Sequence, residues 1–179
     1  IYKFQYKMQK NWLERTELLI KENGIEKLQN ANLLIVGLGG VGSFAAEFLA
    51  RSGVGKMTIV DGDTVDITNI NRQLPALHST IGKSKVEVVA DRLLDINPKL
   101  ELVKINEFLS PEKMEEVIDS QEFNYILDCI DSVTPKVTLL LMAKRRKIKI
   151  VSCMGAGGKI NPAKVMVRDI SKTYNCFLA

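Results

Sequence analysis

The sequence predicts an α/β protein that is doubly wound around a mostly parallel sheet, with a Rossmann-like glycine loop. Short apolar runs alternate with amphipathic stretches across residues 33–153. The first run, 33–36, is wholly apolar and ends in a glycine-rich segment, and the second ends in an acid, Asp61. Strands that alternate with helices favour parallel pairing, because each helix returns the chain across the sheet.

The first elements follow from periodicity. A mixed amphipathic helix is expected over 11–28, with a candidate break at Asn23-Gly24. Residues 33–36 predict a buried strand, since the run carries no polar face. A helix over 41–52 follows, with Gly53 just beyond its end. Its apolar side is expected to be formed by Phe44, Ala45, Phe48 and Leu49.

The pattern then repeats with a strand over 57–60, a helix over 83–95 and a strand over 100–105. A short helix is expected over 111–119, because Ser110 and Pro111 make a good cap and first-turn pair. The inward face of the 83–95 helix is expected to consist of Val86, Val89, Ala90, Leu93 and Leu94. The remaining elements are expected to be a strand over 125–130, a helix over 135–147 that starts at Pro135, a strand over 148–153 and a strand over 164–168.

Composition predicts an ordinary globular protein of 179 residues, 46% of them hydrophobic. Residues 11–179 are expected to form a single domain, and 1–10 an N-terminal extension in which Met8 is a candidate natural start. No apolar run reaches the roughly 20 residues that cross a bilayer, so membrane association is not indicated. Three scattered cysteines favour a reducing compartment, most simply the cytoplasm. The net charge of +4 permits an anionic partner such as RNA.

The segment after the first strand matches the G-x-G-x-x-G pattern. Its glycines are Gly37, Gly39, Gly40 and Gly42. Such glycines provide a tight turn, backbone approach to phosphate and close packing of the next helix on its strand. The alternative is a structural glycine turn without a ligand. Between a strand and a helix, the pattern predicts phosphate binding at the helix N-terminus.

Asp61 follows Gly42 by 19 residues, where an acid can accept hydrogen bonds from ribose hydroxyls. That position suits a nicotinamide cofactor or ATP. A triphosphate attacked at its α-phosphorus concentrates more charge than a dinucleotide, and it needs cationic side chains and usually a divalent metal. Candidate cations are Arg72, Lys85 and Arg15, and Asp131 is a candidate Mg²⁺ ligand. In the alternative interpretation, the cations are solvated surface charges and Asp131 is a helix cap.

Several motifs resemble the ubiquitin-activating-like superfamily, which includes ThiF, MoeB and HesA. They are GLGGVGS, IVDGDTVDITNINRQ, GKSK and LDCIDS. The resemblance covers nearly all of residues 12–178 and implies ATP-dependent adenylation of a carboxylate by a homodimer. Members of this superfamily continue for several tens of residues beyond the position that matches Cys176, so the resemblance implies a domain that lacks its C-terminal part.

The resemblance also implies roles for individual residues. Gly40 would lie along the phosphates, Asp61 would hold the ribose, and Lys85 would contact a phosphate. Asp131 would hold Mg²⁺, and Arg15 would reach the ATP of the neighbouring subunit. The further residues expected to contact ATP are Asp63, Asn69, Arg72, Gln73 and Ser132.

Three further motifs resemble the branch of this superfamily that acts on threonylcarbamoyladenosine in tRNA. They are RQLPALHSTIGKSK, SCMGAGGKINP and DISKTYNC. This resemblance implies that ATP activates the threonyl carboxylate and that an internal nucleophile then displaces AMP. The ring closes with net loss of water, and the partner is a tRNA substrate.

Other positions keep two interpretations. Sulfur-carrier activators often bear a C-x-x-C zinc half-site where this chain has Thr173 to Cys176, so no zinc is expected. Cys176 is either a nucleophile or sulfur-relay thiol, which would imply a sulfur-relay protein partner, or a loop cysteine. Cys129 and Cys153 are interpreted as core residues. Residues 155–158 either approach substrate or a monovalent cation or form a flexible turn, and His78 is a candidate base or a structural histidine.

The basic run at 144–149 is interpreted as a hydrated helix end, with contact to tRNA phosphates as the alternative. Three competing functions stay open beside the tRNA enzyme. One is adenylation of the C-terminal glycine of a ubiquitin-like sulfur carrier. Another is a nucleotide-holding subunit that regulates a partner without turnover. A nicotinamide oxidoreductase is disfavoured, because residues 63–73 would have no evident role in it.

Overall fold

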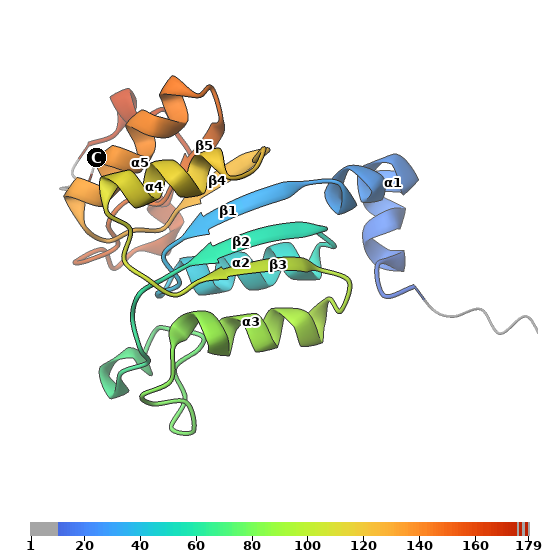
Figure 1. Cartoon of the computed structure of the whole chain (residues 1–179), viewed down its shortest axis with the longest axis horizontal. Coiled ribbons are helices and arrows are strands. Elements are labelled where there is room, and N and C mark those ends of the chain that lie inside the picture. The colour runs from blue at the N-terminus through green and yellow to red at the C-terminus, as the bar shows by residue number, and fades with distance from the viewer. Residues whose placement is uncertain (1–10, 175, 177, 179) are drawn as a thin grey trace, which may run out of the picture.

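The structure is a computed structural model that describes residues 11–174, 176 and 178. The N-terminal extension expected at 1–10 lies outside the described residues. The described chain forms a five-stranded parallel sheet in the order β3-β2-β1-β4-β5, with helices on both faces (Figure 1). The predicted α/β fold class is confirmed.

Apart from the strand expected over 164–168, the predicted elements appear in the predicted order with small shifts at their ends. The strands are β1 (Asn32–Val36), β2 (Lys56–Val60), β3 (Glu101–Ile105), β4 (Tyr125–Asp128) and β5 (Lys149–Ser152). The α-helices are α1 (Glu14–Gln29), α2 (Gly42–Arg51), α3 (Lys85–Ile96), α4 (Pro111–Asp119) and α5 (Val133–Arg145). Three short 3₁₀ helices are η1 (Ile67–Asn69), η2 (Pro162–Lys164) and η3 (Ile170–Lys172). No helix in the described part of the chain combines the length and the apolar character needed to cross a bilayer.

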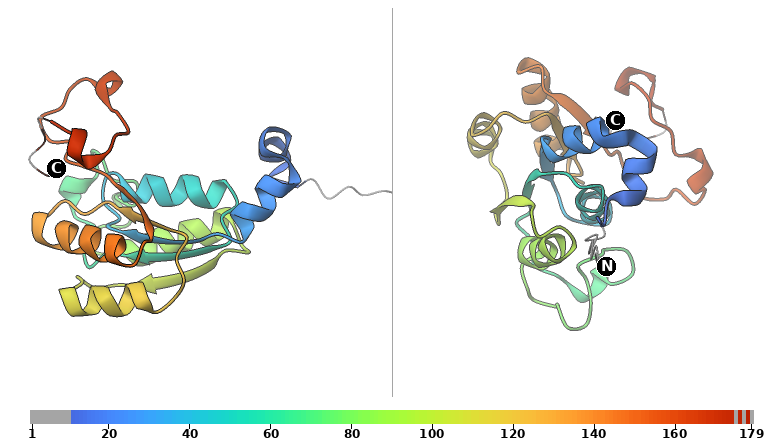
Figure 2. Two further views of the ribbon diagram at one scale, coloured as in Figure 1. Left: turned by 90° about the horizontal axis from the view of Figure 1, so that it is seen from above. Right: turned by 90° about the vertical axis from the view of Figure 1, so that its right-hand side faces the viewer.

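The apolar run of β1 is explained by burial on both faces of the sheet. Leu33 and Ile35 pack in the cluster that α2 and α3 cover, whereas Leu34 and Val36 pack in the cluster that α4 and α5 cover. Figure 2 shows α2 and α4 on opposite sides of the strands. A central parallel strand therefore has no polar face, as its sequence predicts.

The strand order changes direction at β1, whose neighbours are β2 and β4. In open α/β sheets, the crevice outside the carboxyl ends of the strands at this point is the usual ligand site. The chain segments that follow β1, β2 and β4 leave the sheet at this edge, whereas α1 lies at the opposite, amino edge (Figure 1). The fold therefore brings the glycine loop and the acidic segment after β2 together.

The prediction for the buried side of α2 is wrong in part, because Leu49 packs against the core and Ala45 is partly buried, whereas the two phenylalanines are exposed. Phe44 and Phe48 are 41% and 65% exposed, and the buried residues of the helix body are Ser43, Ala46, Glu47 and Ala50. Apart from Glu47, whose carboxylate pairs with Arg51 and Arg92, the buried side chains of this helix are small. Leu94 in α3 is likewise 40% exposed rather than inward, whereas the other four residues predicted for that face are buried.

A helix kink, a helix start and one predicted strand also differ from the prediction. The kink in α1 falls at Lys21, whose φ of 63° and ψ of 173° are not helical, rather than at Asn23-Gly24. Helix α5 begins at Val133, two residues before Pro135. Pro135 therefore lies in the first turn, where its missing N–H costs no hydrogen bond within the helix. No strand forms over 164–168, because Val165 and Val167 are 81% and 98% exposed and no described strand pairs with them.

A partly buried ionic cluster joins α2 to α3. Glu47 is 8% exposed and accepts hydrogen bonds from Arg51 Nε at 2.8 Å and from Arg92 Nη2 at 3.1 Å. The hydrogen bond from Arg92 is the main reason that the pKa of Glu47 lies below its usual value, and Arg51 adds to the effect while burial opposes it. The cluster therefore depends on an ionised Glu47.

We predict that Glu47→Gln lowers the free energy of unfolding by about 1–2 kcal/mol at neutral pH, because charged hydrogen bonds are lost. Since the folded-state pKa of Glu47 is lowered, its contribution is present above the usual carboxyl pKa and disappears as pH falls through the folded-state value. Urea unfolding of both proteins in steps from neutral to acidic pH should show the difference shrinking. The exposed Glu22→Gln serves as the control, and a Glu47→Gln difference that is constant with pH would contradict the ionic origin.

Candidate active site

The turn that ends β1 depends on two glycines. The N–H of Gly37 donates to the carbonyl of Val60 at 2.8 Å, and its φ of 93° is a conformation that side chains disfavour. A Cβ on Gly42 would lie only 1.8 Å from the Gly37 carbonyl oxygen and 3.0 Å from Cβ of Cys129. Helix α2 can therefore start this close to β1 and β4 only with glycine at position 42.

The other two glycines of the loop lie beside the residues that follow η1. A Cβ on Gly39 would lie 3.6 Å from Gln73 Nε2, and one on Gly40 would lie 3.2 Å from the Arg72 carbonyl oxygen. Arg72 and Gln73 therefore lie against the glycine loop, as the sequence predicts for a phosphate site. The Gln73 Oε1 atom is buried and has no hydrogen-bond partner among the described residues, so a polar acceptor is left at the loop for a ligand to use.

Asp61 ties the end of β2 to the same loop. Its Oδ2 accepts a hydrogen bond from the backbone N–H of Leu38 at 2.6 Å, and its Oδ1 accepts from that of Asp63 at 2.8 Å. The carboxylate thus holds the glycine loop in place. Each oxygen has further acceptor capacity, so the predicted contact with ribose hydroxyls is compatible with this role.

The segment between Asp61 and Arg72 is a folded turn. Asp66 caps η1, and hydrogen bonds from the hydroxyl and N–H of Thr68 lower its pKa. Asn69 is buried, its Oδ1 accepts from the N–H of Asp66 at 3.1 Å, and its carbonyl accepts from the N–H groups of Arg72 and Gln73. The side chain of Asn69 therefore helps to close the turn that aims residues 72 and 73 at the glycine loop.

Lys85 is a nearly buried cation whose ion-pair partner is Asp63. Its ammonium lies 2.7 Å from Asp63 Oδ2, with side-chain exposures of 6% for the lysine and 51% for the acid. The backbone N–H of Lys85 also donates to the Asp63 carbonyl at 3.0 Å. Asp63 thus neutralises the lysine that the sequence assigns to a phosphate, and a phosphate that approached it would compete with this acid.

Asp131 and Ser132 follow β4 and are both exposed. Cys129 packs against the glycine loop, since a Cβ on Gly37 would lie 2.7 Å from its carbonyl oxygen. This packing brings the segment after β4 to the same edge as the loop. The guanidinium of Arg72 does not reach Asp131 but donates to the Thr68 carbonyl and to Asn71 Oδ1 at 3.0 Å each.

Arg15 is the predicted site residue that this chain does not bring to the glycine loop. It lies in α1, at the amino edge of the sheet and away from the carboxyl edge (Figure 1). The sequence assigned it to the site of a neighbouring subunit, and its position within one chain is compatible with that assignment.

A buried ion pair behind the site was not predicted from the sequence. Lys136 in the first turns of α5 and Asp128 at the end of β4 are 1% and 0% exposed, and Nζ lies 2.7 Å from Oδ2. The same ammonium donates to the Cys153 carbonyl at 3.0 Å, and Asp128 Oδ1 accepts from the N–H of Ile130. The pair therefore fixes the turn that leads to Asp131. An acid inside the apolar run 125–130 was the available signal.

The interpretation of Cys129 and Cys153 as core residues is incorrect in part, because each is only partly buried. Their side chains interact with each other, and the hydrogen bond from the Cys129 thiol lowers the pKa of Cys153 to about 7, helped by the charge of Lys136 and opposed by burial. Cys176 Sγ lies 3.8 Å from where a Cβ on Gly155 would stand. All three cysteines therefore lie on the segments that follow β4 and β5.

Two further candidates keep their open interpretations. His78 is exposed in the loop between η1 and α3. In the glycine segment after β5, the carbonyl of Gly155 accepts a hydrogen bond from the ammonium of Lys159 at 2.7 Å. That carbonyl is turned toward a cationic group, so the segment can present oxygens to positive charge.

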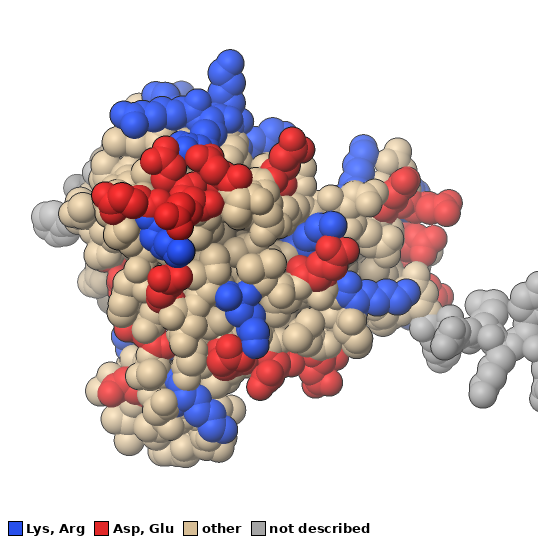
Figure 3. Space-filling view, viewed as in Figure 1, with Lys and Arg blue, Asp and Glu red and all other residues tan. Residues whose placement is uncertain are grey.

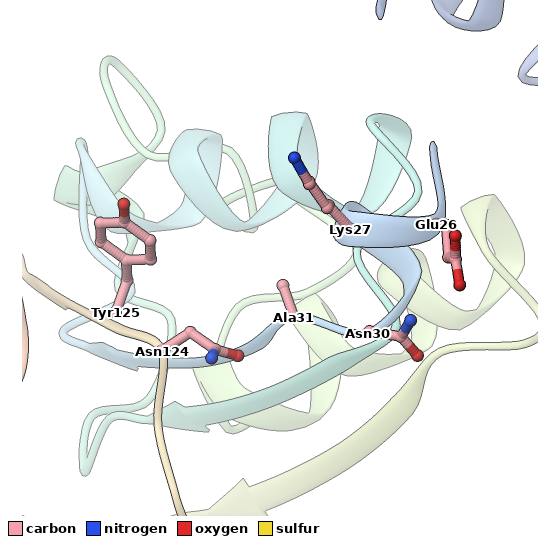
Figure 4. A pocket seen from close by; sticks show the side chains of 6 residues that line it. All are labelled: Glu26, Lys27, Asn30, Ala31, Asn124 and Tyr125. Carbon is pink, nitrogen blue, oxygen red and sulfur yellow. The ribbon is translucent and has the colours of Figure 1, made fainter. Parts of the chain in front are cut away.

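A hollow of about 400 Å³ lies at the amino edge of the sheet, away from the glycine loop. Figure 4 shows Lys27 and Tyr125 rising on its two sides, with Ala31 between them. Its remaining lining residues are Glu26, Asn30 and Asn124. The hollow contains none of the residues that the sequence assigns to nucleotide chemistry, so we place the candidate site at the carboxyl edge.

Comparisons with known proteins agree with the observed fold. A model of the ThiF family matches residues 13–179. The chain is 45% identical to the tRNA threonylcarbamoyladenosine dehydratase of Bacillus subtilis over 160 residues, which are 89% of this chain and 63% of that protein. It is 37% identical to the molybdopterin-synthase adenylyltransferase of Escherichia coli over 130 residues, which are 73% of this chain and 51% of that protein.

The crystal structure of E. coli tRNA N6-threonylcarbamoyladenosine dehydratase, TcdA, in complex with ATP superposes with a TM-score of 0.88 at 40% identity. The match covers 92% of this chain and 67% of that one. The curated E. coli dehydratase is 41% identical over 171 residues, 94% of this chain and 63% of the relative. The chain thus spans less than two thirds of the length of these curated dehydratases.

We predict that Gly42→Ala destabilises the protein by about 4 kcal/mol or prevents folding, because its methyl group would overlap the Gly37 carbonyl. Gly39→Ala is the matched control, since its methyl group would meet Gln73 Nε2 at an ordinary contact distance of 3.6 Å. Urea unfolding of both variants and of the unchanged protein provides the comparison. Equal stability of the two variants would contradict the described turn.

Proposed function

Because this chain belongs to the ThiF family, we propose that it is an ATP-dependent adenylating enzyme that cyclises threonylcarbamoyladenosine in tRNA. One observation carries the adenylation: Arg72 and Gln73 lie against a glycine loop, and the buried ammonium of Lys85 follows on the next helix. The similarity to dehydratases of B. subtilis and E. coli supports the tRNA substrate.

The geometry of the loop supports a triphosphate as ligand. Gly39 and Gly40 have no side chain between their backbone and the approaching ligand, and the N-terminus of α2 supplies free N–H donors and a partial positive charge. The carbonyl and the aliphatic part of Arg72 lie beside Gly40, and its guanidinium is the cation that this segment offers to a phosphate. Lys85 contributes an ammonium that is shared with Asp63 until a phosphate competes for it.

Asp131 is the residue that would hold Mg²⁺. Among the described residues no group of three or more acids, histidines or cysteines could enclose a metal ion. Mg²⁺ commonly binds through one or two carboxylates together with substrate phosphates, and a single exposed acid beside the phosphate loop fits that mode. The bound ion would neutralise charge on the departing pyrophosphate.

The proposed reaction has two displacement steps. A threonyl carboxylate oxygen attacks the α-phosphorus of ATP, pyrophosphate leaves, and an acyl adenylate forms. A nitrogen or oxygen nucleophile of the same modified base then attacks the acyl carbon, and AMP leaves with one carboxylate oxygen. The oxygen that the modified base loses is carried away in AMP. The conversion of ATP to AMP and pyrophosphate therefore accounts for the net loss of water from the base. The residues of this chain orient the reacting groups and neutralise charge, which are the terms that positioned cations supply.

The distribution of charge supports a polyanionic substrate. Residues 133–179 contain ten Lys and Arg residues and one acid, Asp169, whereas residues 1–132 contain fifteen Lys and Arg residues and twenty acids. Figure 3 shows Lys and Arg gathered over α5 and the segment after β5, above an acidic area over α4. Arg146 is paired with Asp119 and Glu115, but Lys144, Arg145 and Lys147 are exposed. Such a charge asymmetry favours nucleic acid.

A second copy of the chain is part of the proposal. Arg15 needs a neighbouring subunit to meet a glycine loop, and the exposed face of α2 is apolar at Val41, Phe44 and Phe48. An apolar helix face of this kind marks an interaction surface. A role for Cys176 as nucleophile or sulfur-relay thiol, a sulfur-relay partner and a monovalent cation at residues 155–158 stay predictions.

One alternative has a specific observation behind it. The similarity to molybdopterin-synthase adenylyltransferases favours a protein carboxylate, the C-terminal glycine of a ubiquitin-like carrier, as the second candidate substrate. The first step would be the same. The two candidates differ in the surface that recognises the substrate, because a carrier protein has no need of the basic area over α5.

The function is tested by mixing the protein with ATP, Mg²⁺ and either threonylcarbamoyladenosine-modified tRNA or a sulfur-carrier protein. We expect AMP and the cyclised base with the tRNA only. AMP with the carrier only supports the alternative, and ATP binding without AMP from either substrate indicates a regulatory subunit. NAD binding in place of ATP binding would indicate an oxidoreductase.

Arg72→Ala should lower AMP formation at least about 100-fold, because the positioned cation that neutralises developing phosphate charge is lost. The matched control is Arg51→Ala, in the last turn of α2 and away from the glycine loop. Circular dichroism and thermal unfolding should show that both variants are folded. Unchanged AMP formation by Arg72→Ala would remove this residue from the mechanism.

The tRNA surface is tested by the triple variant Lys144→Glu, Arg145→Glu and Lys147→Glu. It should raise the KM for tRNA at least about tenfold and leave ATP affinity unchanged, because phosphate contacts are lost. The control replaces three exposed lysines elsewhere, Lys21, Lys27 and Lys99, with glutamate. Equal effects of both triple variants would show that net charge, rather than the surface over α5, controls tRNA binding.

A further inference from the structure

We propose that Cys129 and Cys153 form a redox-active dithiol at which a peroxide installs a reversible disulfide beneath the glycine loop. The disulfide itself is independent of the proposed function. Its consequence for ATP, derived below, rests on that function.

The two cysteines directly follow a paired position of neighbouring parallel strands. Asp128, the last residue of β4, is in register with Ser152, the last residue of β5, and the side chains of Cys129 and Cys153 are hydrogen-bonded to each other. Neighbouring strands lie about 4.8 Å apart, which falls within the Cα separation of about 4.4–6.8 Å that a disulfide spans. Side chains at matching positions also point to the same face of the sheet.

Neither residue is sealed in the core, since Cys129 and Cys153 are each only partly buried. The hydrogen bond from Cys129 lowers the pKa of Cys153 most, and the charge of Lys136, whose ammonium donates to the Cys153 carbonyl at 3.0 Å, adds to this effect, while burial and the charge of Asp128 oppose it. A thiolate is the reactive form of cysteine. Cys153 is therefore the residue that attacks first, and Cys129 is the neighbouring thiol that resolves the product.

The chemistry balances with a peroxide as the oxidant. The Cys153 thiolate attacks one oxygen of hydrogen peroxide, which forms a sulfenic acid and releases hydroxide. The Cys129 sulfur then attacks the sulfenic sulfur, and water leaves with the Cys129 proton. Two thiols and one peroxide thus become one disulfide and two waters. A dithiol reductant reverses the change by thiol–disulfide exchange.

The glycine loop is packed closely against Cys129, so movement of Cys129 would displace the loop. A Cβ on Gly37 would lie 2.7 Å from the Cys129 carbonyl oxygen, and one on Gly42 would lie 3.0 Å from Cβ of Cys129. A disulfide fixes the distance between Cys129 and Cys153 and so constrains the backbone that supports the loop. We therefore expect the oxidised protein to bind ATP more weakly than the reduced protein.

The disulfide is tested by treating the full chain with hydrogen peroxide, blocking free thiols and mapping the digested peptides by mass spectrometry. The expected product is one intramolecular link between the peptides that contain Cys129 and Cys153, and dithiothreitol removes it. Cys176→Ser should keep the link, whereas Cys129→Ser and Cys153→Ser should each lose it. A link that includes Cys176, a link between two chains, or oxidation of Cys153 without a link overturns the proposal.

The consequence is tested by titrating ATP into the reduced and oxidised forms of Cys176→Ser. We expect an ATP affinity at least about tenfold lower in the oxidised form and full recovery after reduction. Equal affinities in the presence of the mapped disulfide overturn the coupling to the glycine loop. If the reduced protein does not bind ATP, the proposed function fails instead, and the peptide mapping still decides the dithiol.

Discussion

The contact between Gly42 and the carbonyl of Gly37 is the constraint on which the rest of this site depends. No side chain fits there, so α2 starts directly at the end of β1 and its N-terminus faces the crevice at the carboxyl edge. The neighbouring segments are fixed against the same turn: Val60 accepts a hydrogen bond from Gly37, Asp61 from Leu38, and Cys129 packs beneath. The charged side chains are thus arranged around a closely packed backbone turn.

Much of this arrangement was predictable from the sequence, for a physical reason. Parallel strands end at one edge of a sheet, so residues that follow the first, second and fourth apolar runs must meet there. That rule predicted that Arg72 would lie near the glycine loop, and the family resemblance implied the same for Gln73. The run LLIV at residues 33–36 has no polar face and predicted a buried parallel strand, which the central place of β1 explains. The strand order itself was not predicted.

The remaining features depended on packing and pairing that periodicity does not encode. The exposure of Phe44 and Phe48 follows from the small residues that let α2 approach the sheet, and a count of apolar residues points to the opposite face. The pairing of Lys85 with Asp63 requires a turn whose closure by Asn69 is not visible in the sequence. The burial of Asp128 with Lys136, and the meeting of Cys129 with Cys153, depend on the pairing of β4 with β5.

The central claim is that this edge of the sheet manages triphosphate charge, with Lys85 released from Asp63 when a phosphate arrives. A crystal structure of the chain with a non-hydrolysable ATP analogue and Mg²⁺ tests it most directly. The account predicts phosphates along Gly39 and Gly40, a guanidinium contact from Arg72, and the Lys85 ammonium on a phosphate oxygen. Phosphates bound elsewhere, for example beside Lys27 at the amino edge, or a Lys85 still paired with Asp63 beside a bound triphosphate, would contradict it.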